Sequence, residues 1–298
     1  MKTTKTENLV FDEFSASKYN ENLYRYDNVA TGISSLDSVT DEHVAYYRDN
    51  GFLVIQNAFV LEKIKAARNG MMDLIDGKSP EFTKAVALAP EKNLIQFEGS
   101  MRNSLNTIPL EERRNAVRKI QFFVDYEPRL KALAEDSKFL AVVSKLINAK
   151  PELFTDQALS KPAKIGREKP WHQDHAFFNL PMGTPIVGCW IALDKAMPEN
   201  GCMHVKPRTH KEGPVVHFKK RDWQICDDQV DLTRDVMIPL NPGGLLFFDG
   251  LMQHGTPANK TSFRRRALQF HYIPVDTPRT NKESRLAVFG SEGKNVTC

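Results

Sequence analysis

The segment Trp171-His172-Gln173-Asp174-His175 carries the strongest chemical signal in this 298-residue chain. Its His172 and Asp174 stand two positions apart, and residues i and i+2 of a β-strand project from the same face. A strand here would therefore direct an imidazole and a carboxylate to one point. This pair supplies two ligands of a 2-His-1-carboxylate facial triad, which holds a metal ion and leaves coordination positions open.

A third ligand must come from a distant part of the chain, and His254 is the candidate. It follows the apolar run 245–248, which predicts a neighbouring strand. His-x-Asp is common by chance and the chain holds eight histidines, so these three residues alone are weak support. Arg265 adds weight, because it stands eleven positions after His254 and a turn between them would place both at one cavity. A guanidinium there can bind a carboxylate through two parallel hydrogen bonds.

The first half of the chain predicts helices around one strand. Residues 1–38 are polar and irregular, and we expect them to form an arm that lies over the domain. Helices are predicted at 41–51, 61–75, 127–134 and 137–147, and Thr40 and Gly51 can cap and end the first of them. A strand is predicted at 52–55, and residues 78–115 predict a long loop region.

After Lys150 the pattern changes to short apolar runs separated by turn residues. The runs lie at 153–154, 186–193, 201–205, 215–218, 243–248 and 267–273. Short strands with irregular spacing indicate a β-sandwich or barrel and not a βαβ array. We therefore expect a mainly β fold with N-terminal helices, as a single domain over 39–298 with its β-rich core at about 150–274.

Composition excludes several classes of protein. The net charge is only +4, and the densest basic cluster, Arg264-Arg265-Arg266, is too short for a nucleic-acid surface. No apolar run approaches the roughly 18 residues of a membrane span, and the polar N-terminus predicts no signal peptide. The four cysteines lack CxxC spacing, which argues against a zinc knuckle and a disulfide scaffold. A reducing, cytoplasmic location is expected, with an organelle matrix as the alternative.

Taken together, these motifs resemble the phytanoyl-CoA dioxygenase family of Fe(II)/2-oxoglutarate-dependent oxygenases. The resemblance runs from about Asp41 to Pro274, with segments in the family's order at 50–54, 172–174, 190–194, 199–205 and 254–265. One departure is Arg208, since the family usually has glycine at this position of a Pro-Gly-Ser-His turn. Another is Gln157, where an apolar residue is usual.

The resemblance implies a double-stranded β-helix, or jelly-roll, core of cupin-like type, buttressed by α-helices. It implies that His172, Asp174 and His254 bind the metal. It also implies a set of cosubstrate contacts, namely Arg265 and Thr256 at the far carboxylate of 2-oxoglutarate, with Trp190, Lys119 and Gln157 nearby. Among these, Lys119 could also be a solvated charge on a helix.

The implied activity is hydroxylation of an unactivated C–H bond of a small-molecule or acyl substrate. It would use Fe(II), 2-oxoglutarate and dioxygen and release succinate and CO2, with ascorbate as a candidate stimulant. The carboxylate of Asp174 favours hydroxylation, because related halogenases lack it. Strand alternation predicts that Gln173 points away from the metal and that Arg264 and Arg266 point outward to solvent. The highly charged stretch 219–240 predicts an exposed lid or insert more than an apolar acyl tunnel.

Two alternatives remain open on the same fold. One is a non-oxidative cupin-like metal protein that binds a ligand or isomerises a sugar, which would have no need of Arg265 and Thr256. The other is a nucleic-acid demethylase, which the weak basic character disfavours. The expected partner is therefore a small-molecule substrate, with neither nucleic acid nor membrane.

Overall fold

A computed structural model describes residues 9–13, 18–105, 107–290 and 298 of the chain. In chain order, its strands are β1 (Val10–Phe11), β2 (Phe52–Ile55), β3 (Ile95–Phe97), β4 (Val117–Gln121), β5 (Pro151–Lys161), β6 (Lys169–His172), β7 (Val187–Ala192), β8 (Met203–Val205), β9 (His217–Lys219), β10 (Trp223–Ile225), β11 (Val236–Ile238), β12 (Leu245–Asp249), β13 (His254–Thr256) and β14 (Arg265–Pro274). Its α-helices are α1 (Asp41–Asn50), α2 (Leu61–Ile75), α3 (Pro80–Leu88), α4 (Leu110–Arg113), α5 (Pro128–Ala134), α6 (Ser137–Ile147) and α7 (Lys282–Phe289). The polar start that predicts no signal peptide lies in residues 1–8, outside the described residues.

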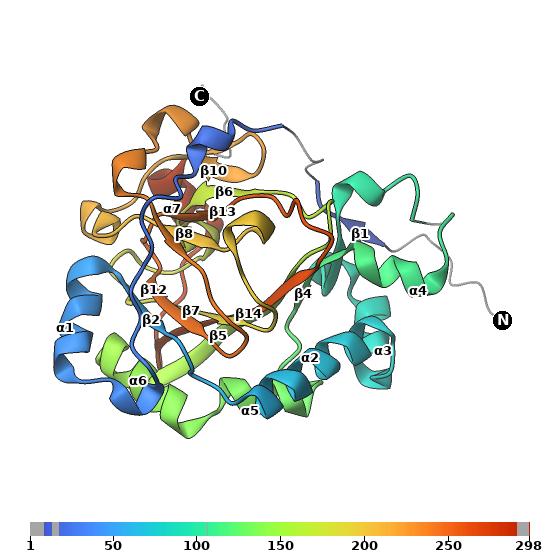
Figure 1. The fold of residues 1–298 in the computed structure, drawn as a ribbon, viewed down its shortest axis with the longest axis horizontal. Coiled ribbons are helices and arrows are strands. Elements are labelled where there is room, and N and C mark those ends of the chain that lie inside the picture. Colours follow the sequence, from blue (N-terminus) through green and yellow to red (C-terminus); the bar gives the residue numbers. More distant parts are fainter. Residues whose placement is uncertain (1–8, 14–17, 106, 291–297) are drawn as a thin grey trace.

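Most strands form two sheets that face each other (Figure 1). The larger sheet has the order β1-β3-β4-β5-β14-β7-β12-β2, and the smaller has the order β11-β8-β13-β6. From β5 onward the chain passes back and forth between them, with β5, β7, β12 and β14 in the larger sheet and β6, β8, β11 and β13 in the smaller. This arrangement is a double-stranded β-helix, so the predicted jelly-roll fold class is confirmed.

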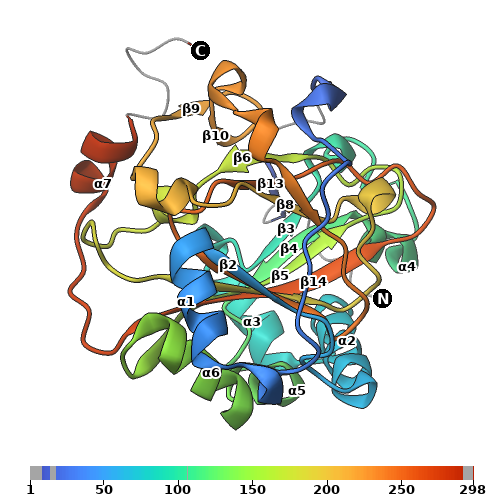
Figure 2. The same ribbon diagram turned by 60° about the vertical axis from the view of Figure 1, so that its left-hand side comes forward.

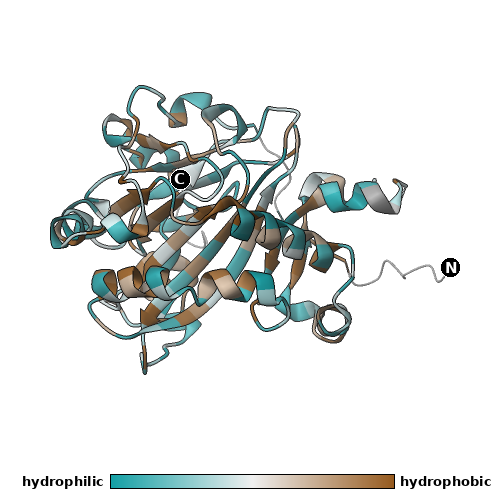
Figure 3. Ribbon diagram, turned by 60° about the horizontal axis from the view of Figure 1, so that its bottom comes forward, coloured by the Kyte–Doolittle hydropathy of each residue, from teal (hydrophilic) through white to brown (hydrophobic). Residues whose placement is uncertain are grey.

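Helices cover the outer face of the larger sheet, as Figure 2 shows for α1, α2, α5 and α6. Helix α6 illustrates the local reasons. The carboxylate of Asp136 accepts hydrogen bonds from the first helical N–H groups, and Asn148 ends the helix in the left-handed region at φ 55°. Between these caps the helix buries one apolar face, and Phe139 stacks on Phe247 of β12 with ring centroids 5.8 Å apart. Figure 3 shows this apolar colouring along the strands and on the helices that cover them.

Strand β14 shows how the core and the interior of the jelly-roll share one segment. Leu268 and Phe270 point toward the helices and are fully buried in the main apolar core. Because side chains alternate along a strand, Arg265, Gln269 and His271 point the other way, between the sheets. The packing of Leu268 and Phe270 against the helices therefore fixes which face of β14 the polar side chains occupy.

The described parts of the N-terminal arm lie on the domain. Strand β1 adds to the edge of the larger sheet by pairing in parallel with β3. Further along, Leu23 accepts a hydrogen bond from the indole N–H of Trp171, and Val29 forms a bridge with Met237. The division into an arm over 1–38 and a domain over 39–298 stays a prediction. No described helix combines the length and the apolarity that crossing a bilayer requires.

The prediction of loop structure over 78–115 is wrong in part. The structure places α3, β3 and α4 within this range, and it adds β4 directly after it. Strand β4 pairs with both β3 and β5. Its sequence, Val117-Arg118-Lys119-Ile120-Gln121, puts charged and amide side chains on the face toward the interior, so it lacks the apolar pattern of a buried strand. The predicted helices at 61–75 and 137–147 have the bounds of α2 and α6, so both are confirmed.

The charged stretch 219–240 is only partly exposed, so the prediction of an exposed lid or insert is wrong in part. It contains β10 and β11, and Ile225 is fully buried. Two of its acidic residues are also buried: Asp222 binds Arg167 and Lys169, and Asp235 binds His204. Charge density alone could not reveal this, because each buried carboxylate has a partner far away in the sequence.

Cysteine pairing also differs from the expectation. Cys226 and Cys298 form a disulfide whose Cα atoms lie 5.5 Å apart and whose residues are separated by 72 positions. Cys189 and Cys202 are free and buried. The spacing of cysteines in the sequence cannot reveal a single disulfide between distant residues. It can reveal only the short repeats of metal knuckles and disulfide-rich domains.

Candidate active site

Three predicted metal ligands meet between the two sheets. His172 is the last residue of β6 and His254 the first of β13, and the two are direct partners in the register of the smaller sheet. Asp174 begins a short 3-10 segment, Asp174–Phe177. Its Oδ1 lies 3.3 Å from Nε2 of His172 and 3.5 Å from Nε2 of His254, and one ligand atom from each residue lies within 4.8 Å of the others. The expectation that a strand carries both His172 and Asp174 is wrong, because β6 ends at His172. The two side chains nevertheless meet at one point, as that expectation predicted.

The donor set fits a divalent metal ion. Nδ1 of His172 donates to the carbonyl of Pro170 at 2.7 Å, and Nδ1 of His254 donates to that of Met252 at 3.0 Å. Each ring therefore directs the lone pair of Nε2 at the shared point. Burial, helped by His254 and Lys169, lowers the pKa of His172 to about 4, so this ring is neutral near pH 7. Two imidazoles and one carboxylate, which are the whole cluster found among the described residues, are the set that suits Fe(II).

Two further residues hold the carboxylate of Asp174 from β14. Nε2 of His271 donates to Oδ2 at 2.7 Å, and the amide of Gln269 donates to the same oxygen at 3.0 Å. All three side chains are buried. Although burial opposes ionisation, His254 and His271 hold the pKa of Asp174 well below its usual range. Sequence reasoning missed Gln269 and His271. They stand four and six positions after Arg265 on β14, and residues an even number of positions apart share one face of a strand.

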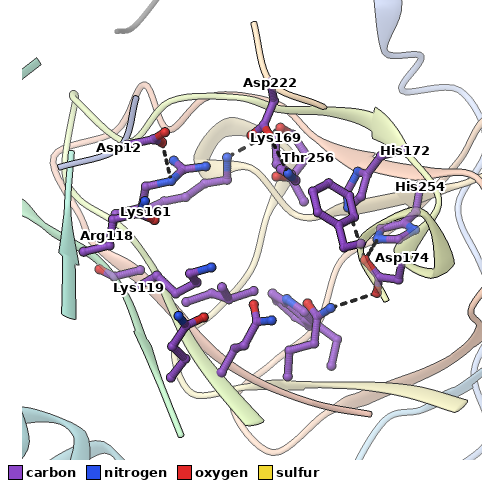
Figure 4. A pocket seen from close by; sticks show the side chains of 18 of the residues that line it. Asp12, Arg118, Lys119, Lys161, Lys169, His172, Asp174, Asp222, His254 and Thr256 are labelled. Atoms are coloured by element: carbon purple, nitrogen blue, oxygen red, sulfur yellow. Dashed lines mark hydrogen bonds and ion pairs between the residues drawn. The ribbon is translucent and has the colours of Figure 1, made fainter. Parts of the chain in front are cut away.

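A cavity of about 620 Å³ opens beside the triad (Figure 4). The five residues predicted to contact the cosubstrate all line it, namely Lys119, Gln157, Trp190, Thr256 and Arg265. The structure thus brings together residues from β4, β5, β7, β13 and β14. It does not bring in His175, whose ring lies 3.4 Å from the carbonyl of Leu180 and is not part of the lining.

Arg265 is the most informative residue of this cavity. It is only 2% exposed, and within the described part of the chain its Nε and Nη1 have no hydrogen-bond partner. Its guanidinium lies 5.2 Å from the ring centroid of Trp190. A buried charged donor without an acceptor costs a few kcal/mol, so a ligand carboxylate is the natural partner. Such orphaned donors fit the far carboxylate of a 2-oxo diacid.

The two arginines that flank Arg265 point away from the cavity, as predicted, but they are not free in solvent. Arg266 forms an ion pair with Asp194 at 2.7 Å. Arg264 donates to the side-chain oxygen of Asn115. Gln173 also points away from the metal, since its amide donates to the carbonyls of Gly213 and Leu251.

Lys119 is on a strand and faces the cavity, so its interpretation as a solvated helix charge is wrong. Its ammonium forms no hydrogen bond or ion pair with another described residue. Burial, together with Lys169 and Arg118, lowers the pKa of Lys119 to about 8. Gln157 lies nearby on β5, opposite Gln269 in the register. The roles of Lys119 and Gln157 at the cosubstrate stay predictions.

A network of ion pairs forms part of the cavity wall, and sequence reasoning did not anticipate it. Asp12, from the N-terminal arm, binds Arg118 at 2.8 Å and Arg167 at 2.5 Å. Arg167 also binds Asp222 at 2.8 Å, and Asp222 binds Lys169 at 3.0 Å. In Figure 4, Asp12, Arg118 and Lys119 are at one side of the pocket, and the triad is at the other.

Comparisons with known proteins agree with this geometry. A family model described as phytanoyl-CoA dioxygenase (PhyH) matches residues 47–267. The chain is 25% identical over 281 residues to phytanoyl-CoA dioxygenase domain-containing protein 1 of Danio rerio, covering 84% of this chain and 96% of the relative. It is 29% identical over 275 residues to peroxisomal phytanoyl-CoA dioxygenase of Rattus norvegicus, covering 86% of this chain and 72% of the relative.

Solved structures share the fold at lower sequence identity. EctD from S. alaskensis superposes with a TM-score of 0.62 at 21% identity, covering 86% of this chain and 85% of that chain. EvdO2 from Micromonospora carbonacea, complexed with 2-oxoglutarate, superposes with a TM-score of 0.61 at 22% identity, covering 85% and 97%. These similarities support the same jelly-roll architecture.

Proposed function

The chain belongs to the phytanoyl-CoA dioxygenase family of 2-oxoglutarate-dependent oxygenases, and from this premise we propose that it hydroxylates an unactivated C–H bond of a small-molecule or acyl substrate. The reaction would consume 2-oxoglutarate and dioxygen and release succinate and CO2. One observation carries the proposal: the buried Arg265, whose Nε and Nη1 find no partner among the described residues, faces the same cavity as the His172-Asp174-His254 triad.

In this proposal each residue has a separate task. His172, Asp174 and His254 hold Fe(II), which supplies the oxidising chemistry with 2-oxoglutarate and dioxygen. Arg265 binds the far carboxylate of 2-oxoglutarate, and the hydroxyl of Thr256 assists it. The ring of Trp190 packs against the guanidinium of Arg265.

The surrounding chain buries and orients the metal-binding residues. The three ligand residues are each at most 5% exposed, and Asp174 is fixed by Gln269 and His271. Preorganised, buried groups interact more strongly with charge than the same groups do in water. The non-oxidative cupin-like alternative has no need of a 2-oxoglutarate clamp, so it gives no reason for a buried guanidinium in the same cavity as the triad.

The proposal is tested by replacing Arg265 and following 2-oxoglutarate. Arg265→Ala should raise the KM for 2-oxoglutarate more than about tenfold, because a hydrogen bond to a charged group contributes about 1.5–3 kcal/mol. Succinate release and binding of 2-oxoglutarate to the metal-loaded protein are the measurements. Arg266→Ala, at the neighbouring outward position, is the matched control and should leave the KM unchanged. A KM for Arg265→Ala within twofold of wild type would contradict the assignment.

A further inference from the structure

The cavity carries more positive than negative charge. Its lining includes six cationic side chains, Arg118, Lys119, Lys161, Arg167, Lys169 and Arg265. It includes four carboxylates, Asp12, Glu13, Asp174 and Asp222. Asp174 faces the metal site, and Glu13 binds Lys219 at 2.9 Å. The excess of cations therefore remains after Arg265 and Asp174 are assigned to the cosubstrate and the metal.

Most of the cations are already held in place. Arg118 binds Asp12 and Glu98, and Arg167 binds Asp12 and Asp222. Lys161 is buried and donates to the carbonyls of Arg167 and Thr256, at 2.5 and 3.5 Å. These side chains build the wall, and the two arginines have their charges matched by carboxylates.

Lys169 differs because its side chain lines the cavity and is less buried than that of Arg167. Its side chain is 28% exposed, against 6% for that of Arg167. Its carboxylate partner, Asp222, is shared with Arg167. Lys169 can therefore bind a ligand anion while Asp222 keeps its bond to Arg167.

Lys169 also lies close to the metal site. It stands three residues before His172 on β6. The ring of Phe177 links the two, with its centroid 4.5 Å from the ammonium of Lys169 and 5.6 Å from the ring centroid of His172. A small molecule that presents a C–H bond to the metal could therefore reach the ammonium.

The electrostatic surroundings of Lys169 also favour an anion. Burial lowers the pKa of Lys169; Asp222 opposes this shift, and Arg167 and Arg118 add to it. An anion would relieve this repulsion. An acyl chain would not, since it would have to displace water from charged side chains without replacing their hydrogen bonds.

We propose that the substrate is a small anionic molecule whose carboxylate or phosphate group binds Lys169. This inference rests on the proposed function, because it places the substrate beside the metal and the cosubstrate. It deepens that function by naming the substrate class and by disfavouring a long acyl chain held against the charged wall.

Calorimetric titration tests the subsite without knowledge of the substrate. Zn(II)-loaded protein is saturated with N-oxalylglycine, an unreactive analogue of 2-oxoglutarate, so that the Arg265 site is filled. Succinate, methylphosphonate and the neutral succinamide are then titrated separately. We expect succinate or methylphosphonate to bind and succinamide not to bind. Lys169→Met should weaken the binding of the anion about tenfold or more, the loss expected for a charge-assisted hydrogen bond.

Two variants serve as controls. Lys169→Arg keeps the charge and should retain most of the anion binding. Lys65→Met removes an exposed lysine on α2, outside the cavity, and should change nothing. Binding of N-oxalylglycine should persist in Lys169→Met, and this result would show that the variant is folded. If Lys169→Met does not fold, Lys169→Gln takes its place.

Three results would overturn the inference. They are no binding of either anion to wild type, equal anion binding by Lys169→Met, and equal binding of succinamide. A failure of N-oxalylglycine to bind wild type would instead count against the proposed function. In that case the difference in anion binding between wild type and Lys169→Met still tests Lys169, because Arg265 is present in both proteins.

Discussion

Asp174 uses its two carboxylate oxygens for different contacts. Oδ1 faces the two histidines, and Oδ2 accepts hydrogen bonds from His271 and Gln269. The local spacing of His172 and Asp174 predicted the first contact. It could not predict the second, because His271 is separated from Asp174 by 97 positions and reaches it only through the pairing of sheets.

Replacing His271 should weaken metal binding. We expect His271→Asn to raise the dissociation constant for Co(II) or Fe(II) about tenfold or more, since partners that orient a metal ligand typically contribute 10–100-fold. The d–d absorption of the Co(II) protein should also change as Oδ2 becomes free to coordinate. His175→Asn, at a buried histidine outside the triad's contacts, is the control. Unchanged affinity and an unchanged spectrum would show that His271 does not position Asp174.

At the scale of elements, strands with polar inner faces were the hardest to predict. Strand β14 combines apolar residues toward the helices with charged and amide residues toward the cavity, and its apolar half made it recognisable. Strand β4 has fewer apolar positions and was missed. Helices α2 and α6 were predicted with their observed bounds, because each has an apolar stripe at helical spacing. The polar side chains that line the interior make these strands hard to predict from sequence, and the same side chains form the site.

His217 ties β9 to the metal-binding segment and should make stability depend on pH. Its Nδ1 donates to the carbonyl of Val215, and its Nε2 accepts from the backbone N–H of Gln173 at 3.0 Å. Burial lowers the pKa of His217 from 6.5 to about 3, despite the opposing hydrogen bond to Val215. Between these values the unfolded state binds a proton that the folded state does not. Stability from this group is therefore full above pH 6.5 and is lost as the pH falls toward 3.

Urea unfolding of wild type and His217→Gln at a series of pH values measures this effect. Wild type should lose more stability than the variant between about pH 6.5 and 4.5, and the difference between them should be constant between about pH 7 and 8. His172 has a lowered pKa too, and comparison of the two proteins removes its contribution. Parallel curves across the whole range would contradict the role of His217.

The disulfide joins the C-terminal residue to the segment that follows β10. Closing a long loop restricts the unfolded chain, which typically stabilises a protein by about 2–4 kcal/mol. We expect Cys298→Ser, or reduction of wild type, to lower the free energy of unfolding by this amount. Reductant should have no further effect on the variant. Equal stability of oxidised and reduced wild type would show that the bond adds nothing, in line with the reducing location expected from the sequence.

At the scale of the whole molecule, residues from three regions build one cavity. The jelly-roll supplies the triad and Arg265, β4 supplies Arg118 and Lys119, and the N-terminal arm supplies Asp12. The sequence predicted the fold class and the triad because their signals are local or have a defined spacing. It did not predict the wall of ion pairs, because Asp12, Arg118, Arg167 and Asp222 meet only when the arm, β4, the loop before β6 and the turn between β9 and β10 come together.

The arm should therefore contribute to stability through Asp12. This carboxylate is 5% exposed and binds both Arg118 and Arg167. Asp12→Asn removes its charge from two buried guanidinium groups, each of which keeps another acidic partner, Glu98 or Asp222. We expect the free energy of unfolding to fall by about 1–3 kcal/mol, the usual cost of a lost hydrogen bond to a charged group.

The matched control for Asp12 lies in the same arm. Asp27 pairs with Arg25 on the surface, where both side chains are at least half exposed, so Asp27→Asn should change stability by less than about 1 kcal/mol. Hydrogen exchange at β1 and β3 separates detachment of the arm from a general loss of stability. If Asp12 anchors the arm, exchange in Asp12→Asn rises first at Val10, Phe11 and their partners on β3. Equal effects of the two substitutions would mean that the arm rests on the sheet without help from the buried ion pairs.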